Sequence, residues 1–200
     1  MSAVRVLLLP GWQDSGPGHW QSRWQARHGF ERLQQDDWWW PKRGDWMTRL
    51  QDSLLADDRP TVLVAHSLGC HLVAAWVAHA RQVAPQHLGR VAAALLVAPP
   101  DLARADAPPQ LQAWAPAAHA AQTALPALAF PSTLVLSADD PFSDAACSLR
   151  TGADWGCEIV SLGAAGHVNG DSGLGDWPEG LALLQALMRR AGIGDAPATA

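Results

Sequence analysis

The sequence predicts an α/β fold in which helices cover both faces of one parallel, doubly wound sheet. Strand-like and helix-like segments alternate along the chain, which is the pattern of parallel sheets with helical crossovers. One strand-like run, residues 91–98, is apolar without interruption, as expected where both faces of a strand are buried. The 200 residues are 48% hydrophobic, which suits a single domain with a sizeable core. We therefore expect one domain over residues 1–191, followed by a flexible tail over residues 192–200.

Six segments have the composition of strands. Residues 4–9 and 61–65 are rich in Val and Leu, whereas residues 31–34 match the pattern more weakly. The full set of predicted strands is residues 4–9, 31–34, 61–65, 91–98, 132–137 and 157–161.

Helices are expected between these strands. The predicted helices cover residues 19–27, 45–56, 68–80 and 177–190, with one more between the fifth and sixth strands. The second of them has apolar residues at nearly helical spacing and Asp45 in the N-cap position. Residues 99–130 are rich in Ala and Pro and have no steady period, so we expect loops and a short helix that lie over the functional site.

Composition and charge exclude several classes of protein. The formal net charge is −5 and Lys and Arg form no basic run, which argues against nucleic acid or an anionic membrane as a partner. Residues 1–9 are too short to cross a bilayer and are not followed by a small-residue cleavage site. Cys70, Cys147 and Cys157 show no metal-ligand spacing, and their odd number indicates reduced thiols. We expect an unprocessed, cytoplasmic protein.

The most informative segment is residues 61–70, TVLVAHSLGC. An apolar strand passes into small-His-Ser-Leu-Gly and then into a helical pattern, which is the sequence of a nucleophile elbow around Ser67. The crowded turn needs small residues on both sides of the serine. Gly69 is the usual residue there, and Ala65 replaces the commoner glycine with the smallest possible change. The alternative is that Ser67 only caps the following helix. The position of Ser67 directly after a strand favours the nucleophile elbow.

A serine nucleophile requires a base and an acid, and the chain supplies candidates in the order nucleophile, acid, histidine. Asp139 and Asp140 follow the fifth strand, at the sheet edge where the catalytic groups of parallel sheets gather. His167 lies in a glycine-rich loop after the last strand. His66 adjoins Ser67, but neighbours along an extended chain point to opposite faces, so it is a poor base. Further histidines lie in helix-like or alanine-rich stretches, where packing or solvation is expected: His28, His71, His79, His87 and His119.

Four segments of the chain resemble the signature blocks of a known family. The blocks are residues 9–21, 64–70, 137–142 and 166–173, and the last continues into residues 177–180. They resemble those of the small serine hydrolases related to the bacterial YdeN proteins and to human retinoblastoma-binding serine hydrolase. The blocks run in family order from the first strand to the last helix. The resemblance implies a lidless α/β-hydrolase fold with strand order 2-1-3-4-5-6, which acts on esters or amides through a Ser-Asp-His triad, here Ser67, Asp140 and His167.

The choice of Asp140 over Asp139 as the acid has two grounds. Hydrolases of this fold commonly place the acid three residues beyond the small residue that closes the strand, which is the spacing from Ser137 to Asp140. Pro141 pushes the residue before it toward an extended conformation, which would aim the carboxylate off the sheet edge toward His167. Asp139 is then expected to face elsewhere, where it caps the next helix or accepts loop N–H groups.

The loop after the first strand is expected to complete an oxyanion hole. In this fold one donor is the backbone N–H of the residue after the nucleophile, here Leu68, and the other comes from a loop after an adjacent strand, here Trp12 or Gln13. Gly11 lets that backbone approach the substrate, whereas Pro10 has no N–H to donate. A glycine-rich surface loop without this role is the alternative.

The aromatic composition is unusual, with 11 tryptophans and no tyrosine. Trp20, Trp24 and Trp76 occupy helix-like positions and are expected in the core. The tryptophans in or near predicted loops are Trp12, Trp38, Trp39, Trp40, Trp114 and Trp177. Because binding sites are mostly hydrophobic, the candidates for an apolar substrate pocket are Trp12, Trp114, Phe142 and Trp177.

These observations lead to one expected function and three alternatives. We expect a carboxylesterase without metal or cofactor, which acts on short-chain or small acyl substrates in an open site and transfers the acyl group through Ser67. A thioesterase or an amidase or peptidase of the same fold shares this chemistry, and fold analogy does not choose among them. A protein-binding module that retains the triad is the second alternative, for which the sequence names no partner. A chance assembly of Ser, Asp and His on an unrelated α/β domain is the third.

Overall fold

Six parallel strands form the centre of the molecule in a computed structural model that describes residues 4–115 and 127–194. The strands are β1 (Arg5–Leu9), β2 (Glu31–Arg32), β3 (Thr61–His66), β4 (Val91–Val97), β5 (Ser132–Leu136) and β6 (Glu158–Ser161). They pair in the order β2-β1-β3-β4-β5-β6, and every pair is parallel. The predicted α/β fold and the strand order that the family resemblance implied are both confirmed.

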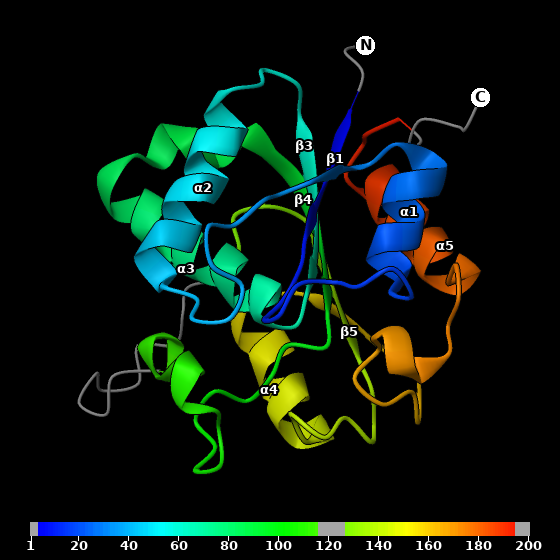
Figure 1. Cartoon of the computed structure of the whole chain (residues 1–200). Coiled ribbons are helices and arrows are strands. Elements are labelled where there is room, and N and C mark those ends of the chain that lie inside the picture. Colours follow the sequence, from blue (N-terminus) through cyan, green and yellow to red (C-terminus); the bar gives the residue numbers. More distant parts are fainter. Residues whose placement is uncertain (1–3, 116–126, 195–200) are drawn as a thin grey trace.

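Helices cover both faces of this sheet (Figure 1). One face is covered by α1 (Trp20–His28) and α5 (Pro178–Arg190), and the other by α2 (Arg43–Leu55), α3 (Leu68–Val83) and α4 (Ala145–Asp154). Short 3-10 helices occur in the connections, at η1 (Pro85–Arg90), η2 (Pro109–Trp114) and η3 (Gly170–Ser172).

Each face of the sheet contributes to a separate hydrophobic layer. Because successive side chains of a strand point to opposite faces, Leu63 and Ala65 of β3 pack in the layer that contains α2 and α3. Val62 and Val64 pack in the layer that contains α1 and α5. All four side chains are fully buried. This burial on both faces explains why the central strands are continuous apolar runs in the sequence.

Some element bounds differ from the prediction. Strand β2 pairs over two residues only, because it lies at the edge of the sheet and has β1 as its one partner. Helix α2 begins at Arg43, and its N-cap is Lys42, which makes no capping hydrogen bond through its side chain. Asp45 lies in the first turn and not at the N-cap. An acidic residue is favourable at either position because of the helix dipole, so composition alone does not separate the two.

Two other predictions concern segments that are described only in part. Within residues 99–130, the short helix is η2, and residues 116–126 lie outside the described residues. The predicted C-terminal tail lies outside them from residue 195 onward. The absence of a lid therefore stays a prediction.

The described residues also bear on the expectations from composition. Cys70, Cys147 and Cys157 are all free thiols. In residues 4–115 and 127–194, no helix combines the length and the apolar composition that crossing a membrane requires.

Helix α3 lies very close to strand β1 at Gly69. A Cβ atom at this position would lie 2.4 Å from the carbonyl oxygen of Leu9 and 3.0 Å from that of Pro10. Both contacts are with backbone, so no change of side-chain conformation relieves them. A glycine at this position therefore fixes how closely the start of α3 packs on the end of β1. Gly44 in α2 is different, because a Cβ atom there would have no neighbour within 4 Å.

We predict that alanine substitutions at these two glycines have opposite effects on stability. Gly69→Ala should lower the free energy of unfolding by about 2 kcal/mol, since overpacking costs about 1–3 kcal/mol. Gly44→Ala should raise it by about 0.5 kcal/mol, because alanine restricts the unfolded chain and favours the helix. Urea unfolding followed by tryptophan fluorescence measures both changes. A Gly69→Ala protein as stable as the wild type would contradict the close approach of α3 and β1.

Candidate active site

Ser67 occupies a sharp turn between the end of β3 and the start of α3. Its backbone has φ 55° and ψ −123°, a conformation that residues with a side chain rarely adopt. The Ser67 N–H donates to the carbonyl oxygen of Val97 on the neighbouring strand β4 at 2.9 Å, and its carbonyl accepts from Cys70 N–H at 3.0 Å. These bonds hold the turn from both sides, so the serine side chain is raised above the carboxyl edge of the sheet.

Gly11 allows the loop after β1 to lie directly beside this turn. A Cβ atom on Gly11 would lie 2.7 Å from the Cβ of Ser67 and 3.2 Å from the backbone nitrogen of Leu68. Any other residue would therefore displace the serine or obstruct the N–H of Leu68. Together with Gly69 on the other side of Ser67, this glycine sets the geometry of the turn.

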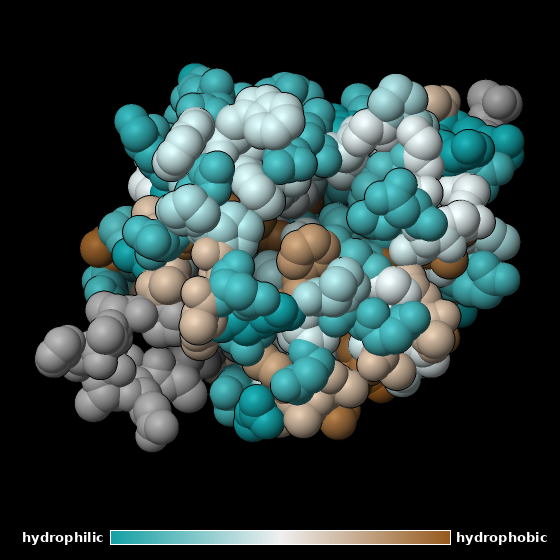
Figure 2. All heavy atoms as spheres, turned by 60° about the horizontal axis from the view of Figure 1, so that its bottom comes forward, coloured by the Kyte–Doolittle hydropathy of each residue, from teal (hydrophilic) through white to brown (hydrophobic). Residues whose placement is uncertain are grey.

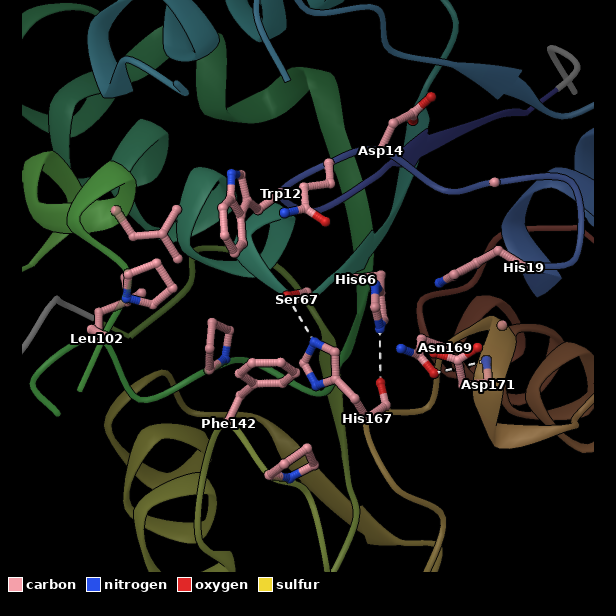
Figure 3. A pocket seen from close by; sticks show the side chains of 18 of the residues that line it. Trp12, Asp14, His19, His66, Ser67, Leu102, Phe142, His167, Asn169 and Asp171 are labelled. Carbon is pink, nitrogen blue, oxygen red and sulfur yellow. Dashed lines mark hydrogen bonds between the residues drawn. The ribbon is translucent and has the colours of Figure 1, made fainter. Parts of the chain in front are cut away.

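The imidazole of His167 lies between Ser67 and Asp140 (Figure 3). Its Nε2 is 2.9 Å from Ser67 Oγ, and its Nδ1 is 3.0 and 2.9 Å from the two carboxylate oxygens of Asp140. Asp140 also accepts the backbone N–H of Phe142 at 2.9 Å, which orients the carboxylate. With the Nδ1 proton donated to the carboxylate, Nε2 is free to accept the proton of the serine hydroxyl.

Asp139 makes different contacts. Its carboxylate accepts the Ser137 hydroxyl at 2.7 Å and the backbone N–H of Gly166 at 2.8 Å, and these bonds hold the pKa of Asp139 below its usual value. The following helix α4 is capped by Asp144, which accepts from the N–H of Cys147. Asp139 therefore ties the end of β5 to the loop that carries His167 and does not touch the imidazole ring.

His66 contacts the loop that carries His167. Its Nε2 donates to the carbonyl oxygen of His167 at 2.9 Å, and its ring packs against the rings of His167 and His19, with centroids 4.9 and 4.6 Å away. Burial holds the pKa of His66 well below that of a free imidazole, and the two neighbouring imidazoles lower it further. The ring is therefore neutral, and it serves as a structural bridge. The sequence argument that His66 is a poor base for Ser67 agrees with this contact.

A tryptophan cluster fixes the loop from the other side. Trp20 donates its indole N–H to the carbonyl oxygen of Val168 at 2.8 Å, and Val168 itself has a positive φ of 50°. The Trp20 ring packs against Trp24 and Trp177, with ring centroids 4.8 and 4.9 Å away. Trp24 in turn donates to the carbonyl oxygen of Asp176 at 2.7 Å. These tryptophans fill the core and also anchor loop carbonyl groups.

Two of the four proposed pocket residues lie away from the site. Trp12 and Phe142 line the cleft beside Ser67, whereas Trp114 and Trp177 do not. Trp114 is buried against Trp46, and its indole N–H donates to the carbonyl of Pro41. Trp177 is 1% exposed and lies at the N-cap of α5 in the tryptophan cluster. A tryptophan near a loop can face either way, so its position in the sequence did not separate the two cases.

The three expected oxyanion donors differ in the hydrogen bonding of their backbone N–H groups. The N–H of Gln13 donates to the carbonyl oxygen of Trp38 at 3.0 Å, so it is already used within the loop. The prediction that Gln13 is an oxyanion donor is therefore wrong. Leu68 begins α3, where the first N–H groups of a helix have no partner in the helix itself. Trp12 follows Gly11, which lies against Ser67 and Leu68, so Leu68 and Trp12 remain as the pair of candidates.

These residues open into a cleft of about 630 Å³ at the carboxyl ends of the strands. Figure 2 brings this end of the molecule forward and shows a depression in which hydrophobic atoms lie between hydrophilic side chains. In Figure 3, Trp12, Leu102 and Phe142 lie on one side of the Ser67–His167 pair. His19 and Asn169 lie on the other side, with Asp171. The cleft therefore has an apolar arm and a polar arm that meet at the serine.

No group of three His, Cys, Asp or Glu side chains within residues 4–115 and 127–194 is arranged to hold a metal ion. The chemistry that the described side chains themselves support is nucleophilic attack by a serine with a histidine base.

A six-stranded parallel sheet in this order, with a serine on a strained turn after β3, defines an α/β-hydrolase fold. The family model for serine hydrolases matches residues 6–186, and the chain belongs to that family. It is therefore a hydrolase, and the predicted family is confirmed. A comparison with curated proteins gives no match.

Solved structures of related proteins agree with this assignment. A YdeN-like hydrolase from Pectobacterium atrosepticum is 26% identical with a TM-score of 0.77, and the match covers 94% of this chain and 92% of that one. The YdeN protein of B. subtilis is 19% identical with a TM-score of 0.67, over 94% of this chain and 100% of that one. Esterase 2 of Thermogutta terrifontis is 18% identical with a TM-score of 0.65, over 98% and 85% of the two chains. At such low identities, the last two similarities show a shared fold.

The buried histidines lead to a prediction about acid stability. Burial lowers the pKa of His19 to about 3 and lowers the pKa of His66 and His71 as well. In the unfolded chain these groups bind a proton as the pH falls below about 6.5, whereas in the folded protein they stay neutral. The unfolded state then binds more protons, so the free energy of unfolding should fall as the pH is lowered from 7 to 5.

The His66→Gln variant tests this origin, because glutamine retains an N–H donor for the carbonyl of His167 but does not titrate. Its free energy of unfolding should depend less steeply on pH between 6.5 and 5, by up to about 1.4 kcal/mol per pH unit. Urea unfolding at several pH values measures the two slopes. If the free energy of unfolding depends equally on pH in the variant and the wild type, His66 is protonated equally in the folded and the unfolded protein.

Proposed function

We propose that this protein is a carboxylesterase that transfers acyl groups through Ser67, with His167 as the base and Asp140 as the acid that orients it. The observation that carries the proposal is the continuous set of contacts from Ser67 Oγ to His167 Nε2 at 2.9 Å and from His167 Nδ1 to Asp140 at 2.9 and 3.0 Å. The side chains of His167 and Asp140 are 9% and 2% exposed, so water competes little with their interaction.

In the first step, Ser67 Oγ attacks the ester carbonyl while His167 Nε2 takes the hydroxyl proton. The imidazolium that forms is stabilised by Asp140, which also holds the tautomer in which Nε2 accepts a proton. His167 then gives the proton to the leaving alcohol, and the acyl group stays on the serine. A water molecule, deprotonated by the same imidazole, attacks the acyl-enzyme, and Ser67 recovers its proton.

The developing oxyanion would be held by backbone N–H groups of Leu68 and Trp12. Leu68 is the first residue of α3, so the positive end of the helix dipole adds to its hydrogen bond. Gly11 keeps this space free, because a Cβ atom there would lie 3.2 Å from the Leu68 nitrogen. Gln13 takes no part in this proposal, because its N–H is bonded to Trp38.

A small ester is the substrate class that the cleft supports best. The apolar arm, with Trp12, Leu102 and Phe142, is suited to a short hydrocarbon chain. Phe142 packs edge-on against His167, with ring centroids 4.6 Å apart, so the hydrocarbon chain would lie directly beside the reacting atoms.

A cytoplasmic location belongs to the same proposal, and the free thiols of Cys70, Cys147 and Cys157 support it.

We predict that a fluorophosphonate probe labels Ser67 and no other serine. Only a serine that has both a base and oxyanion donors reacts readily with such a probe. Ser67→Ala should remain folded and lose labelling, whereas Ser161→Ala, a change on the exposed end of β6, should label as the wild type does. Gel fluorescence and peptide mapping measure the reaction. Labelling of the Ser67→Ala protein at the wild-type rate would disprove the proposed nucleophile.

We also predict that the two neighbouring aspartates differ in their effect on catalysis. Asp140→Asn should lower kcat by at least about a hundredfold, because the amide does not fix the imidazole tautomer or stabilise its charge. Asp139→Asn should lower kcat by less than about tenfold, since Asp139 contacts the loop and not the ring. Hydrolysis of 4-nitrophenyl acetate measures both, with melting temperatures as the control for folding. The reverse ranking would assign the acid role to Asp139.

A further inference from the structure

His19 presents a hydrogen-bond donor that has no acceptor among the described residues. The residue is the N-cap of α1, and its Nδ1 accepts the backbone N–H of Gln21 at 3.1 Å. A neutral imidazole whose Nδ1 accepts must carry its proton on Nε2. That Nε2 atom is buried and makes no hydrogen bond to any described group. The whole residue is only 6% exposed.

His19 stays neutral over the pH range in which an esterase works. Burial, with smaller contributions from the charges of Arg32 and His167, lowers its pKa to about 3. The donor therefore carries no charge. Its role in the fold, the cap on α1, uses only the other ring nitrogen.

The side chain lies in the polar arm of the cleft. His19 lines the cleft together with His66 and Asn169, on the side of Ser67 away from Trp12 and Phe142 (Figure 3). The rings of His19 and His66 lie 4.6 Å apart, and those of His66 and His167 lie 4.9 Å apart. The His66 ring thus lies between the donor and the catalytic base (Figure 3). A group bound to it would belong to the substrate but not to the reacting carbonyl.

A buried donor without an acceptor is costly, and such groups are rare in folded proteins. The loss is recovered when a ligand brings an acceptor, and a site of this kind discriminates strongly against ligands that lack one. Asp171 also lines the cleft and disfavours an anionic ligand there, whereas the charge of Asp14 is paired with Arg32. An uncharged oxygen is the acceptor that suits both the neutral donor and the Asp171 carboxylate.

We propose that His19 is a specificity-determining residue, and that its Nε2–H donates to an uncharged oxygen atom in the substrate arm that lies opposite the apolar arm. This inference rests on the proposed esterase function. The substrate class is then an ester with hydrocarbon on one side of the scissile bond and an ether, carbonyl or hydroxyl oxygen on the other side. Because the His66 ring lies between His19 and His167, the accepting oxygen would lie several atoms from the scissile carbonyl.

Matched esters that differ by one atom test this inference. The first set compares 4-nitrophenyl pentanoate with its analogues in which an ether oxygen replaces one chain methylene in turn. The second compares pentyl acetate with the corresponding ether alcohol esters. The two sets distinguish an acceptor on the acyl side from one on the alcohol side. For each pair, kcat/KM for the oxygen-containing ester is divided by kcat/KM for the all-carbon ester. This ratio is then divided by the ratio of the rate constants with which hydroxide hydrolyses the same two esters.

Two substitutions of His19 separate the donor from the helix cap. His19→Asn places an oxygen where Nδ1 lies and retains the cap, but it removes the far donor. His19→Gln places an N–H group near the position of Nε2 and gives up the cap. Melting temperatures report the loss of the cap independently of specificity.

We expect the wild type to prefer at least one oxygen-containing ester by tenfold or more. His19→Asn should reduce this preference to about twofold or less, and His19→Gln should retain it within about threefold while its melting temperature falls. If no pair shows a preference in the wild type, or if His19→Asn leaves the preference unchanged, the inference is wrong, although fluorophosphonate labelling of Ser67 would still support the esterase. If Ser67 is not labelled and no ester is hydrolysed, the proposed function fails and the inference fails with it.

Discussion

The backbone conformation of Ser67 is the constraint on which the rest of the site depends. A residue with a side chain held at φ 55° and ψ −123° costs about 1–3 kcal/mol, so the surrounding structure must impose it. Gly69 lets α3 pack against the end of β1, and Gly11 lets the next loop lie against the serine itself. The N–H of Ser67 is bonded to Val97 on β4. Three neighbouring strands therefore share in holding one turn.

Neighbouring strands and helix α1 hold the loop that carries His167 beside the serine. The loop with His167 is tied to β3 through the His66 ring, to β5 through Asp139, and to α1 through the indole of Trp20. Each tie uses a hydrogen bond to a backbone group of the loop, which is buried for Trp20, partly buried for His66 and exposed for Asp139. Such bonds are specific in direction as well as favourable in energy. Because His66 is neutral, it adds no charge beside the His167 imidazole. The protein thus positions His167 by its backbone and leaves both ring nitrogens for Ser67 and Asp140.

The sequence predicted the parts of this structure that follow from periodicity and short spacing. The alternation of segments gave the sheet, and the run from strand to small residues to helix located the turn at Ser67. The contacts that were not predicted join segments that are distant in the chain. The Trp177 side chain is buried in the core, and the backbone N–H of Gln13 is bonded to the backbone carbonyl of Trp38. His19 was recognised only as part of a helix start, although its place in a glycine-rich block beside the first strand was the available signal.

We propose that the strained turn places Ser67 Oγ between its base and two backbone donors. A crystal structure of the protein after reaction with a fluorophosphonate would show this arrangement. We expect a bond from phosphorus to Ser67 Oγ, with a phosphoryl oxygen within about 3.1 Å of the backbone nitrogens of both Leu68 and Trp12. An adduct on another residue, or a phosphoryl oxygen that points away from both nitrogens, would contradict it.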